Sequence, residues 1–146
     1  MKKATVLIML TLFLALVVYA CAQKEEAEKM KAADPAAELA KSVANGKKLF
    51  NDTSLGTSGM TCNSCHMEGG TKEGKMGETV IPAWDNLAAK YPKYFKMAER
   101  VYTLDQVVQF CIVNPLKGKA LAWDDQKLTD LTAYCASVKK APKMEK

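Results

Sequence analysis

Apolar residues follow two different patterns along this chain. Residues 4–20, ATVLIMLTLFLALVVYA, form an almost unbroken apolar run. From residue 36 onward, apolar positions recur at intervals of three and four, which is the period of a helix with one buried face. No alternating pattern of useful length indicates a β-strand, and no internal repeat is present. The periodicity therefore predicts a single all-α domain over residues 36–140.

Three segments with the helical period are predicted to be the main helices. They are residues 36–50, 103–113 and 125–139. Gly46 lies inside the first segment and costs about 1 kcal/mol there relative to alanine, so we expect another backbone to pass close to it. Thr103 and Gln106 begin the second segment with the Thr-x-x-Gln pattern of a capping box.

The segments between these helices are predicted to be loops and short helices. Residues 51–61 and 67–78 are rich in glycine, serine and threonine, as loops are. Residues 81–92 and 93–100 are expected to form two short helical pieces that are interrupted at Pro92.

The N-terminal apolar run has the features of an export signal. Lys2 and Lys3 precede it, and small residues end it. We therefore expect residues 1–20 to be an export signal, residues 21–35 a flexible tether and residues 141–146 a tail. The alternative is a retained membrane anchor. Export would place the protein in the periplasm or on the outer face of a membrane.

The end of the apolar run resembles the lipobox of bacterial lipoproteins. Residues 17–21 read VVYAC, and the resemblance implies that Cys21 is acylated and becomes the first residue of the mature chain. An acyl chain would tether the protein to a membrane surface without spanning it. Cleavage after Ala22, at an Ala-x-Ala site, is the alternative.

The charge of the chain argues against nucleic acid as a partner. The formal net charge is +5, and loss of residues 1–20 removes two lysines and no acids, which leaves 19 basic and 16 acidic residues, or +3. No basic stripe with interleaved aromatic residues is present. The mild positive charge agrees instead with an acidic redox protein as partner.

The candidate chemistry is concentrated in residues 60–68, MTCNSCHME. Cys62 and Cys65 are spaced by one helical turn, and His66, the only histidine, follows at once. Cys-x-x-Cys-His is the attachment sequence for c-type haem. The two thiols add to the two vinyl groups of the haem, and the imidazole binds the iron from the proximal side. The motif predicts one covalent haem c.

Three other interpretations of this motif are weaker. A zinc site needs four ligands, usually in two close pairs, whereas Cys111 and Cys135 are isolated. A thioredoxin-like redox pair is expected in a βαβ setting, which the sequence does not predict. A structural disulfide between Cys62 and Cys65 leaves His66 without a role.

With these residues, the chain over residues 36–140 resembles a class I c-type cytochrome with one haem. NGKKLF resembles the Gly-x-x-x-Phe pattern of its N-terminal helix, and LTDLTAYCASVKK, with Tyr134, resembles its C-terminal helix. The resemblance implies an all-α, cytochrome c-like fold in which the two helices cross over one covalently bound haem. It also implies that the carbonyl of Pro82 accepts a hydrogen bond from His66.

Residues 104–134 resemble, more narrowly, the end of sulfur-oxidising cytochromes of the SoxA and thiosulfate dehydrogenase kind. In these proteins a cysteine-bearing helix precedes an Asn/Ser-x-x-Gly-Lys loop, as Cys111 precedes NPLKGK here. Some of their haems are ligated by His and Cys, whereas others take a methionine from the loop, where this chain has Leu116. The resemblance implies Cys111 as the sixth iron ligand.

Other choices for the sixth ligand remain open. A second histidine is absent, which leaves Cys111, a methionine such as Met76 or Met97, a lysine or an open site. If Cys21 is acylated and the motif holds haem, Cys111 and Cys135 remain as a pair. A disulfide between them would close a loop of about 25 residues and stabilise the fold by roughly 3 kcal/mol.

One-electron transfer to and from redox partner proteins is the function that these features favour. The sole histidine is committed to iron, so no Ser-His-Asp set is available and an electron-transfer protein is favoured over an enzyme. The alternative is a haem subunit or enzyme in the oxidation of inorganic sulfur compounds such as thiosulfate. A third interpretation is a membrane-tethered sensory haem protein with an open sixth position.

Overall fold

The structure is a computed structural model that describes residues 34–139. The chain divides into two compact units, one ending at Glu38 and the other beginning at Leu39. In the first unit, Asp34 starts a helix by accepting hydrogen bonds from the backbone N–H groups of Ala36 and Glu38. The predicted export signal, Cys21 with nearly all of the tether, and the predicted tail lie outside the described residues.

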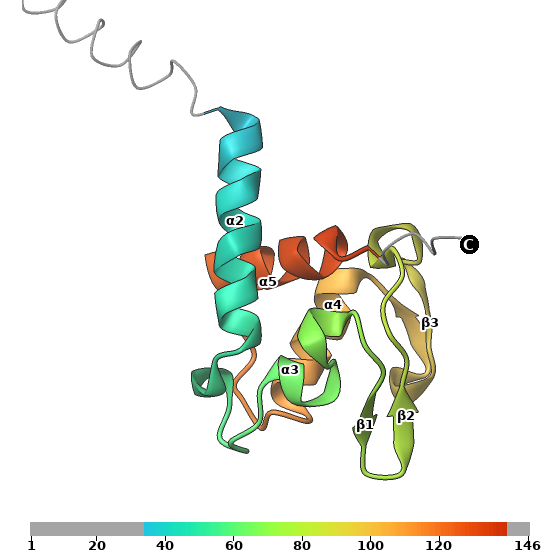
Figure 1. The fold of residues 1–146 in the computed structure, drawn as a ribbon. Coiled ribbons are helices and arrows are strands. Elements are labelled where there is room, and N and C mark those ends of the chain that lie inside the picture. The colour runs from blue at the N-terminus through green and yellow to red at the C-terminus, as the bar shows by residue number, and fades with distance from the viewer. Residues whose placement is uncertain (1–33, 140–146) are drawn as a thin grey trace, which may run out of the picture. The chain divides into compact units, whose positions relative to one another are not determined.

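Within the described residues, four α-helices form most of the regular structure (Figure 1). They are α2 (Pro35–Phe50), α3 (Cys62–Cys65), α4 (Leu104–Val113) and α5 (Gln126–Ser137). The three long ones confirm the helices that the periodicity predicts. The predicted capping box is also present, since the backbone N–H of Thr103 donates to Gln106 Oε1 at 3.0 Å. Short 3₁₀ helices cover Thr53–Leu55, Glu68–Gly70, Leu87–Ala89 and Lys96–Ala98.

Two β-hairpins stand where the sequence predicted loop and short helices. Antiparallel pairs are formed by β1 (Gly74–Met76) with β2 (Thr79–Ile81), and by β3 (Lys93–Phe95) with β4 (Arg100–Tyr102). The helical prediction for residues 93–100 is therefore wrong, apart from one 3₁₀ turn. Aromatic and β-branched residues favour strands, and Phe95 stacks on Tyr102 across the hairpin at 5.4 Å between ring centroids.

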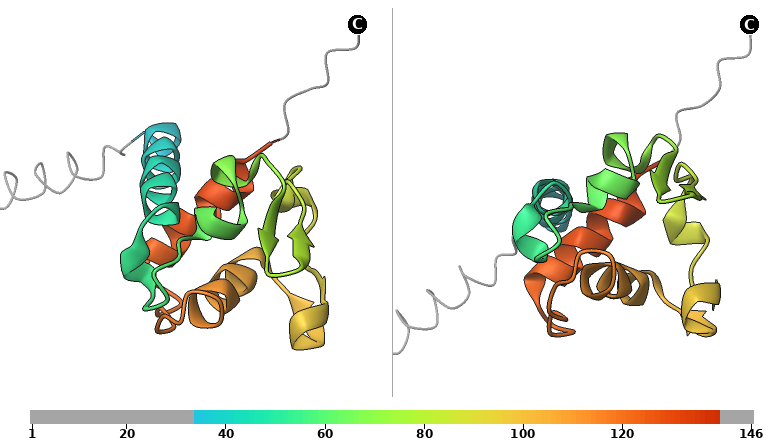
Figure 2. Two further views of the ribbon diagram at one scale, coloured as in Figure 1. Left: turned by 60° about the horizontal axis from the view of Figure 1, so that its bottom comes forward. Right: turned by 90° about the horizontal axis from the view of Figure 1, so that it is seen from below.

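The two terminal helices of the domain, α2 and α5, cross at close range (Figures 1 and 2). A Cβ atom added to Gly46 would overlap the backbone carbonyl of Asp130, which confirms that a second backbone passes this glycine. Ser42 Oγ donates to Asp130 Oδ1 at 2.6 Å at the same crossing. The crossing confirms the cytochrome c-like helical arrangement.

The core lies where α2, α4 and α5 meet. Its largest fully buried side chains are Phe50, Ile112, Leu128 and Leu131. Packing of α4 on α5 places their apolar faces together and leaves the α3 segment and the hairpins around one side of α4 (Figure 2). Within residues 34–139, no helix is long and apolar enough to cross a membrane.

Candidate functional site

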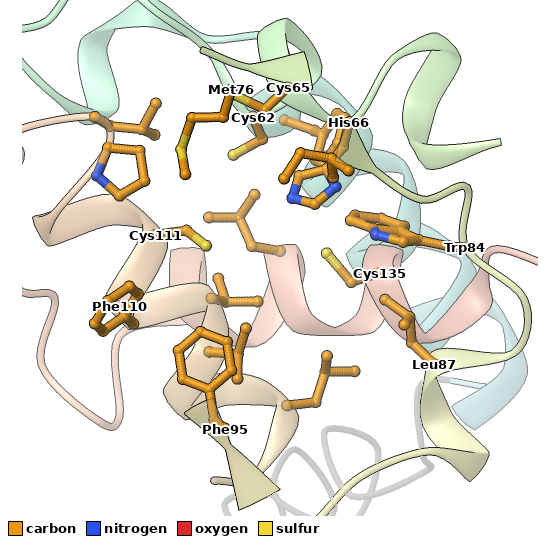
Figure 3. A pocket seen from close by; sticks show the side chains of 18 of the residues that line it. Cys62, Cys65, His66, Met76, Trp84, Leu87, Phe95, Phe110, Cys111 and Cys135 are labelled. Atoms are coloured by element: carbon orange, nitrogen blue, oxygen red, sulfur yellow. The ribbon is translucent and has the colours of Figure 1, made fainter. Parts of the chain in front are cut away.

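An apolar cavity of about 210 Å³ opens between α3, α4, α5 and the two hairpins (Figure 3). Both motif cysteines, His66 and two further cysteines line it together with apolar and aromatic side chains. These include Cys62, Cys65, His66, Met76, Trp84, Phe95, Cys111, Leu116, Leu131 and Cys135. The structure thus brings the Cys-x-x-Cys-His residues to one cavity with Cys111, which follows His66 by 45 positions in the sequence.

The helical turn predicted for the motif is present as α3. Thr61 caps this turn, with its backbone N–H donating to Ser64 Oγ at 3.0 Å. The N–H of His66 donates to the carbonyl of Cys62 at 3.0 Å and closes the turn. Residues three apart on a helix share a face, so Cys62 and Cys65 are placed as neighbours beside His66.

The His66 ring is held among aromatic side chains. Its centroid lies 4.7 Å from that of Trp84 and 6.5 Å from that of Phe50. Burial lowers the pKa of His66 to about 4, so the imidazole is neutral at neutral pH. Its Nδ1 atom is buried and has no hydrogen-bond partner. A neutral imidazole is the form that binds a metal ion.

Nδ1 of His66 has no hydrogen-bond partner in the structure, so its bond to the carbonyl of Pro82 stays a prediction. Pro82 is exposed and does not line the cavity. Trp84 borders the imidazole instead, and its backbone N–H is tied to the carbonyl of Gly70 at 2.7 Å. This attachment fixes the chain two residues beyond Pro82 and places the Trp84 indole ring against His66.

The four described cysteines are free thiols. Burial raises the pKa of Cys62 to about 12 and that of Cys111 to about 11, and it also raises the pKa of Cys135. No disulfide joins Cys111 and Cys135 in the structure, and the sulfurs of both residues point into the cavity (Figure 3). Buried thiols of this kind stay protonated unless a cation lies beside them.

The candidate sixth ligands differ in their placement. Cys111 on α4 and Met76 on β1 both point into the cavity, with Cys111 across from His66 (Figure 3). Met97 also contributes to the lining, but its side chain is 58% exposed. Leu116, the position of a methionine in some relatives of this kind, is buried in the lining at 3% exposure.

The donor set fits a c-type haem. Two thiols one turn apart, a neutral imidazole with an unpartnered buried nitrogen and an apolar lining are the groups that covalent attachment and axial ligation require. No group of three or more His, Cys, Asp or Glu side chains in the described part of the chain is arranged to hold a bare metal ion. The cavity therefore suits a porphyrin better than a zinc ion.

Sequence reasoning identified some of the surrounding residues and missed others. The sequence offers Trp84, Trp123, Tyr94 and Phe95 as aromatic residues that could wall a haem. Trp84 and Phe95 line the cavity, whereas Tyr94 and Trp123 are 59% and 63% exposed. The missed feature is Gln109, whose buried amide makes two hydrogen bonds to the backbone of Leu121, at 2.5 and 3.1 Å. Gln109 lies among apolar residues in the sequence of this helix, and that position could have indicated a buried, hydrogen-bonded amide.

The known proteins that match this chain are sulfur-oxidising cytochromes. The family model described as SoxA/TsdA, cytochrome c domain, matches residues 45–144. Three curated relatives are thiosulfate dehydrogenases. The protein from Allochromatium vinosum is 28% identical over 68% of this chain, that from Stutzerimonas stutzeri 30% over 68%, and that from Psychrobacter arcticus 28% over 51%.

The matched part is a minor part of each relative. It covers 38% of the Allochromatium protein, 32% of the Stutzerimonas protein and 21% of the Psychrobacter protein. The chain thus spans well under half the length of the curated relatives it matches.

Proposed function

Because this chain belongs to the SoxA/TsdA cytochrome c domain family, the c-type cytochromes of the sulfur-oxidising kind, we propose that it is a one-electron carrier with a single covalent haem. The observation that carries the proposal is the meeting of Cys62, Cys65 and His66 at one apolar cavity. When bound, a haem supplies a reversible one-electron change at iron.

Each part of the cavity has a role in this proposal. Cys62 and Cys65 attach the cofactor, and His66 is the proximal ligand. The apolar lining excludes water and lowers the local dielectric, which tunes the potential. Phe50 and Trp84 restrict the orientation of the imidazole from two sides.

Cys111 is the sixth ligand that the geometry supports best. It approaches the cavity from α4, opposite His66, and it is packed at the same cavity as the motif cysteines (Figure 3). Ligation would convert its buried thiol to a thiolate, since a metal cation lowers the pKa of its ligand. Cys135 then stays an inert core thiol. Met76 is the alternative, and Met97 is disfavoured by its exposure.

The test of haem attachment is direct. The exported protein, extracted with acid acetone, keeps its red colour and gives the pyridine haemochrome spectrum of one haem c per chain. Cys62→Ser combined with Cys65→Ser releases all haem into the acetone. A colourless polypeptide from the unaltered protein would refute the proposal.

Sulfur oxidation is a second candidate function, favoured by the thiosulfate dehydrogenases among the relatives. In this role the chain would be a haem subunit or domain that passes on electrons from an inorganic sulfur compound. Incubation of the ferric protein with thiosulfate distinguishes the two functions. Catalytic reduction by this protein alone supports the enzyme, reduction only in the presence of a further subunit supports the haem subunit, and no reduction in either case supports the carrier without a role in sulfur oxidation.

Export and anchoring complete the proposal. Removal of residues 1–20 and acylation of Cys21 would hold the protein in the periplasm or at the outer face of a membrane, near redox partner proteins. Mass spectrometry of the mature protein counts haem and acyl chains in one measurement. A mature chain that starts at residue 23 without lipid would favour plain cleavage.

A further inference from the structure

The β3–β4 hairpin carries a concentration of exposed apolar side chains. Tyr94, Met97 and Val101 are 59%, 58% and 63% exposed, and they are three of the eight large hydrophobic residues exposed in the described part of the chain. Tyr94 and Val101 are cross-strand partners, so their side chains project from the same face of the hairpin. Met97 lies in the turn between the strands. We call these three residues the hairpin patch.

Three basic residues of the same hairpin each precede a residue of this patch in sequence. The basic rim consists of Lys93, Lys96 and Arg100, all exposed. Glu99 is the one acid within the hairpin. Lys93 Nζ lies 4.8 Å from the centre of the Tyr91 ring, and the Arg100 guanidinium lies 5.0 Å from that of Tyr102. Among the described residues, no carboxylate forms a salt bridge with any of the three. Their charge is therefore available to a partner.

The patch is continuous with the cavity. Met97 is the only side chain of the cavity lining that is classed as exposed, and the neighbouring Phe95 lines the cavity from the same hairpin. The wall of the cavity thus reaches the surface at the turn between β3 and β4. A protein bound on this turn would lie closer to the cavity than one bound on the solvent face of α2.

We propose that the hairpin patch and its basic rim are the docking face for an acidic redox protein. An apolar centre with a charged rim is the ordinary anatomy of a protein interface, and a positive rim selects a partner with a negative one. A second copy of this chain would bring like charges together. The inference rests on the proposed electron-transfer function, and it adds where the exchange occurs and with what class of partner.

Binding of the acidic electron carrier rubredoxin, used as a probe, tests the charge of this face. The variant Lys93→Glu with Lys96→Glu is compared with Lys47→Glu with Lys48→Glu, which makes the same charge change on α2. The two sites lie on opposite sides of the domain (Figures 1 and 2). All proteins are used in their haem-loaded form at low ionic strength. Relative to the unaltered protein, we expect the hairpin variant to bind rubredoxin at least about tenfold more weakly, and the α2 variant less than about twofold more weakly.

Two further measurements complete the test. Carbodiimide cross-linking should join probe carboxylates to Lys93 or Lys96, as peptide mass spectrometry reports. Tyr94→Ser with Val101→Ser should weaken binding without changing its salt dependence, because the charged rim is intact. Rates of electron transfer from the reduced probe should fall in the same order.

The outcomes separate this inference from the proposed function. The unaltered protein and each variant are first checked for covalent haem and for a native circular dichroism spectrum, and absence of haem from the unaltered protein would count against the proposed function alone. Equal weakening by both charge variants, or cross-links elsewhere, would overturn the docking face. The docking face would also be overturned if the protein co-sedimented with phosphatidylglycerol vesicles, lost this binding in the Lys93→Glu, Lys96→Glu variant, and did not bind rubredoxin.

Discussion

Cys111 is the residue whose substitution gives the most informative spectrum. With a thiolate on iron, the ferric protein lacks the methionine–iron absorption band near the red end of the visible range. Cys111→Met should create that band, because the side chain starts from α4 and points into the cavity (Figure 3). Cys135→Ala is the matched control and should leave the spectrum unchanged. A methionine band in the unaltered protein would exclude Cys111 and direct attention to Met76.

Single residues were predictable where their chemistry is encoded by neighbours in the chain. Cys62, Cys65 and His66 lie within five consecutive residues, so one local pattern predicts both the proposed attachment and the proposed ligand. Pro82 and the Cys111–Cys135 pair depend on distances between segments that no local pattern fixes. In the structure Trp84 lies against His66, Pro82 does not line the cavity, and the sulfurs of the two distant cysteines both point into the cavity.

At the scale of elements, the crossing of α2 and α5 depends on Gly46. Alanine at an ordinary helical position is about 1 kcal/mol better than glycine. At position 46 its Cβ would overlap the carbonyl of Asp130, so we expect Gly46→Ala to lower the free energy of unfolding by roughly 2 kcal/mol. Urea unfolding followed by circular dichroism measures this. Ala44→Gly, at an exposed position on the same helix, should cost only about 1 kcal/mol, and a stabilised Gly46→Ala protein would contradict the crossing.

Asp130 makes the same crossing dependent on pH. Burial opposes its ionisation, but hydrogen bonds from Ser42 and Gln126 to its carboxylate outweigh burial and lower its pKa. A lowered pKa in the folded state contributes stability above the unfolded pKa of about 3.9, and this contribution is lost as pH falls through the folded value.

Asp130→Asn should therefore flatten the loss of stability between about pH 5 and pH 3. The free energy of unfolding, measured by urea titration at each pH, reports the change. Asp124→Asn, at an exposed acid before α5, serves as the control and should keep the slope of the unaltered protein. An unchanged slope in Asp130→Asn would show that other acids dominate this range.

The helices were predictable and the hairpins were not, because the helices are much longer than the strands. Ten to sixteen residues give a 3.6-residue period several chances to repeat, as in α2 and α4. Each strand here has three residues, too few for an alternating pattern to stand out. The strands are specified by cross-chain contacts such as Phe95 on Phe110, with ring centroids 5.1 Å apart, which the local sequence does not reveal.

At the scale of the whole molecule, the cavity makes stability depend on the cofactor. A cavity of about 210 Å³, at about 24 cal/mol per Å³, corresponds to a loss of about 5 kcal/mol. Domains of this size have a total stability of only about 5–15 kcal/mol. We therefore expect Cys62→Ser with Cys65→Ser, purified without haem, to unfold at a much lower urea concentration than the loaded protein.

The control for this comparison is Cys135→Ser, which keeps the attachment residues. It should bind haem and lose less stability than the double variant. Equal midpoints for the haem-free and loaded proteins would mean that the cavity closes on its own. The periodicity predicts the helices, but their arrangement around the cavity was predicted only through the family resemblance, because much of its stabilisation is expected from a group that the sequence does not contain.

The placement of Trp84 has an optical consequence. The chain has two tryptophans: Trp84 is 9% exposed and lies against His66, whereas Trp123 is 63% exposed. Without porphyrin, the buried indole should emit at shorter wavelength and resist iodide, while the exposed one should be quenched by it. A chromophore entering beside His66 should extinguish the shorter-wavelength component first. The intensity of the Trp84 emission should therefore report what fraction of the protein has bound haem.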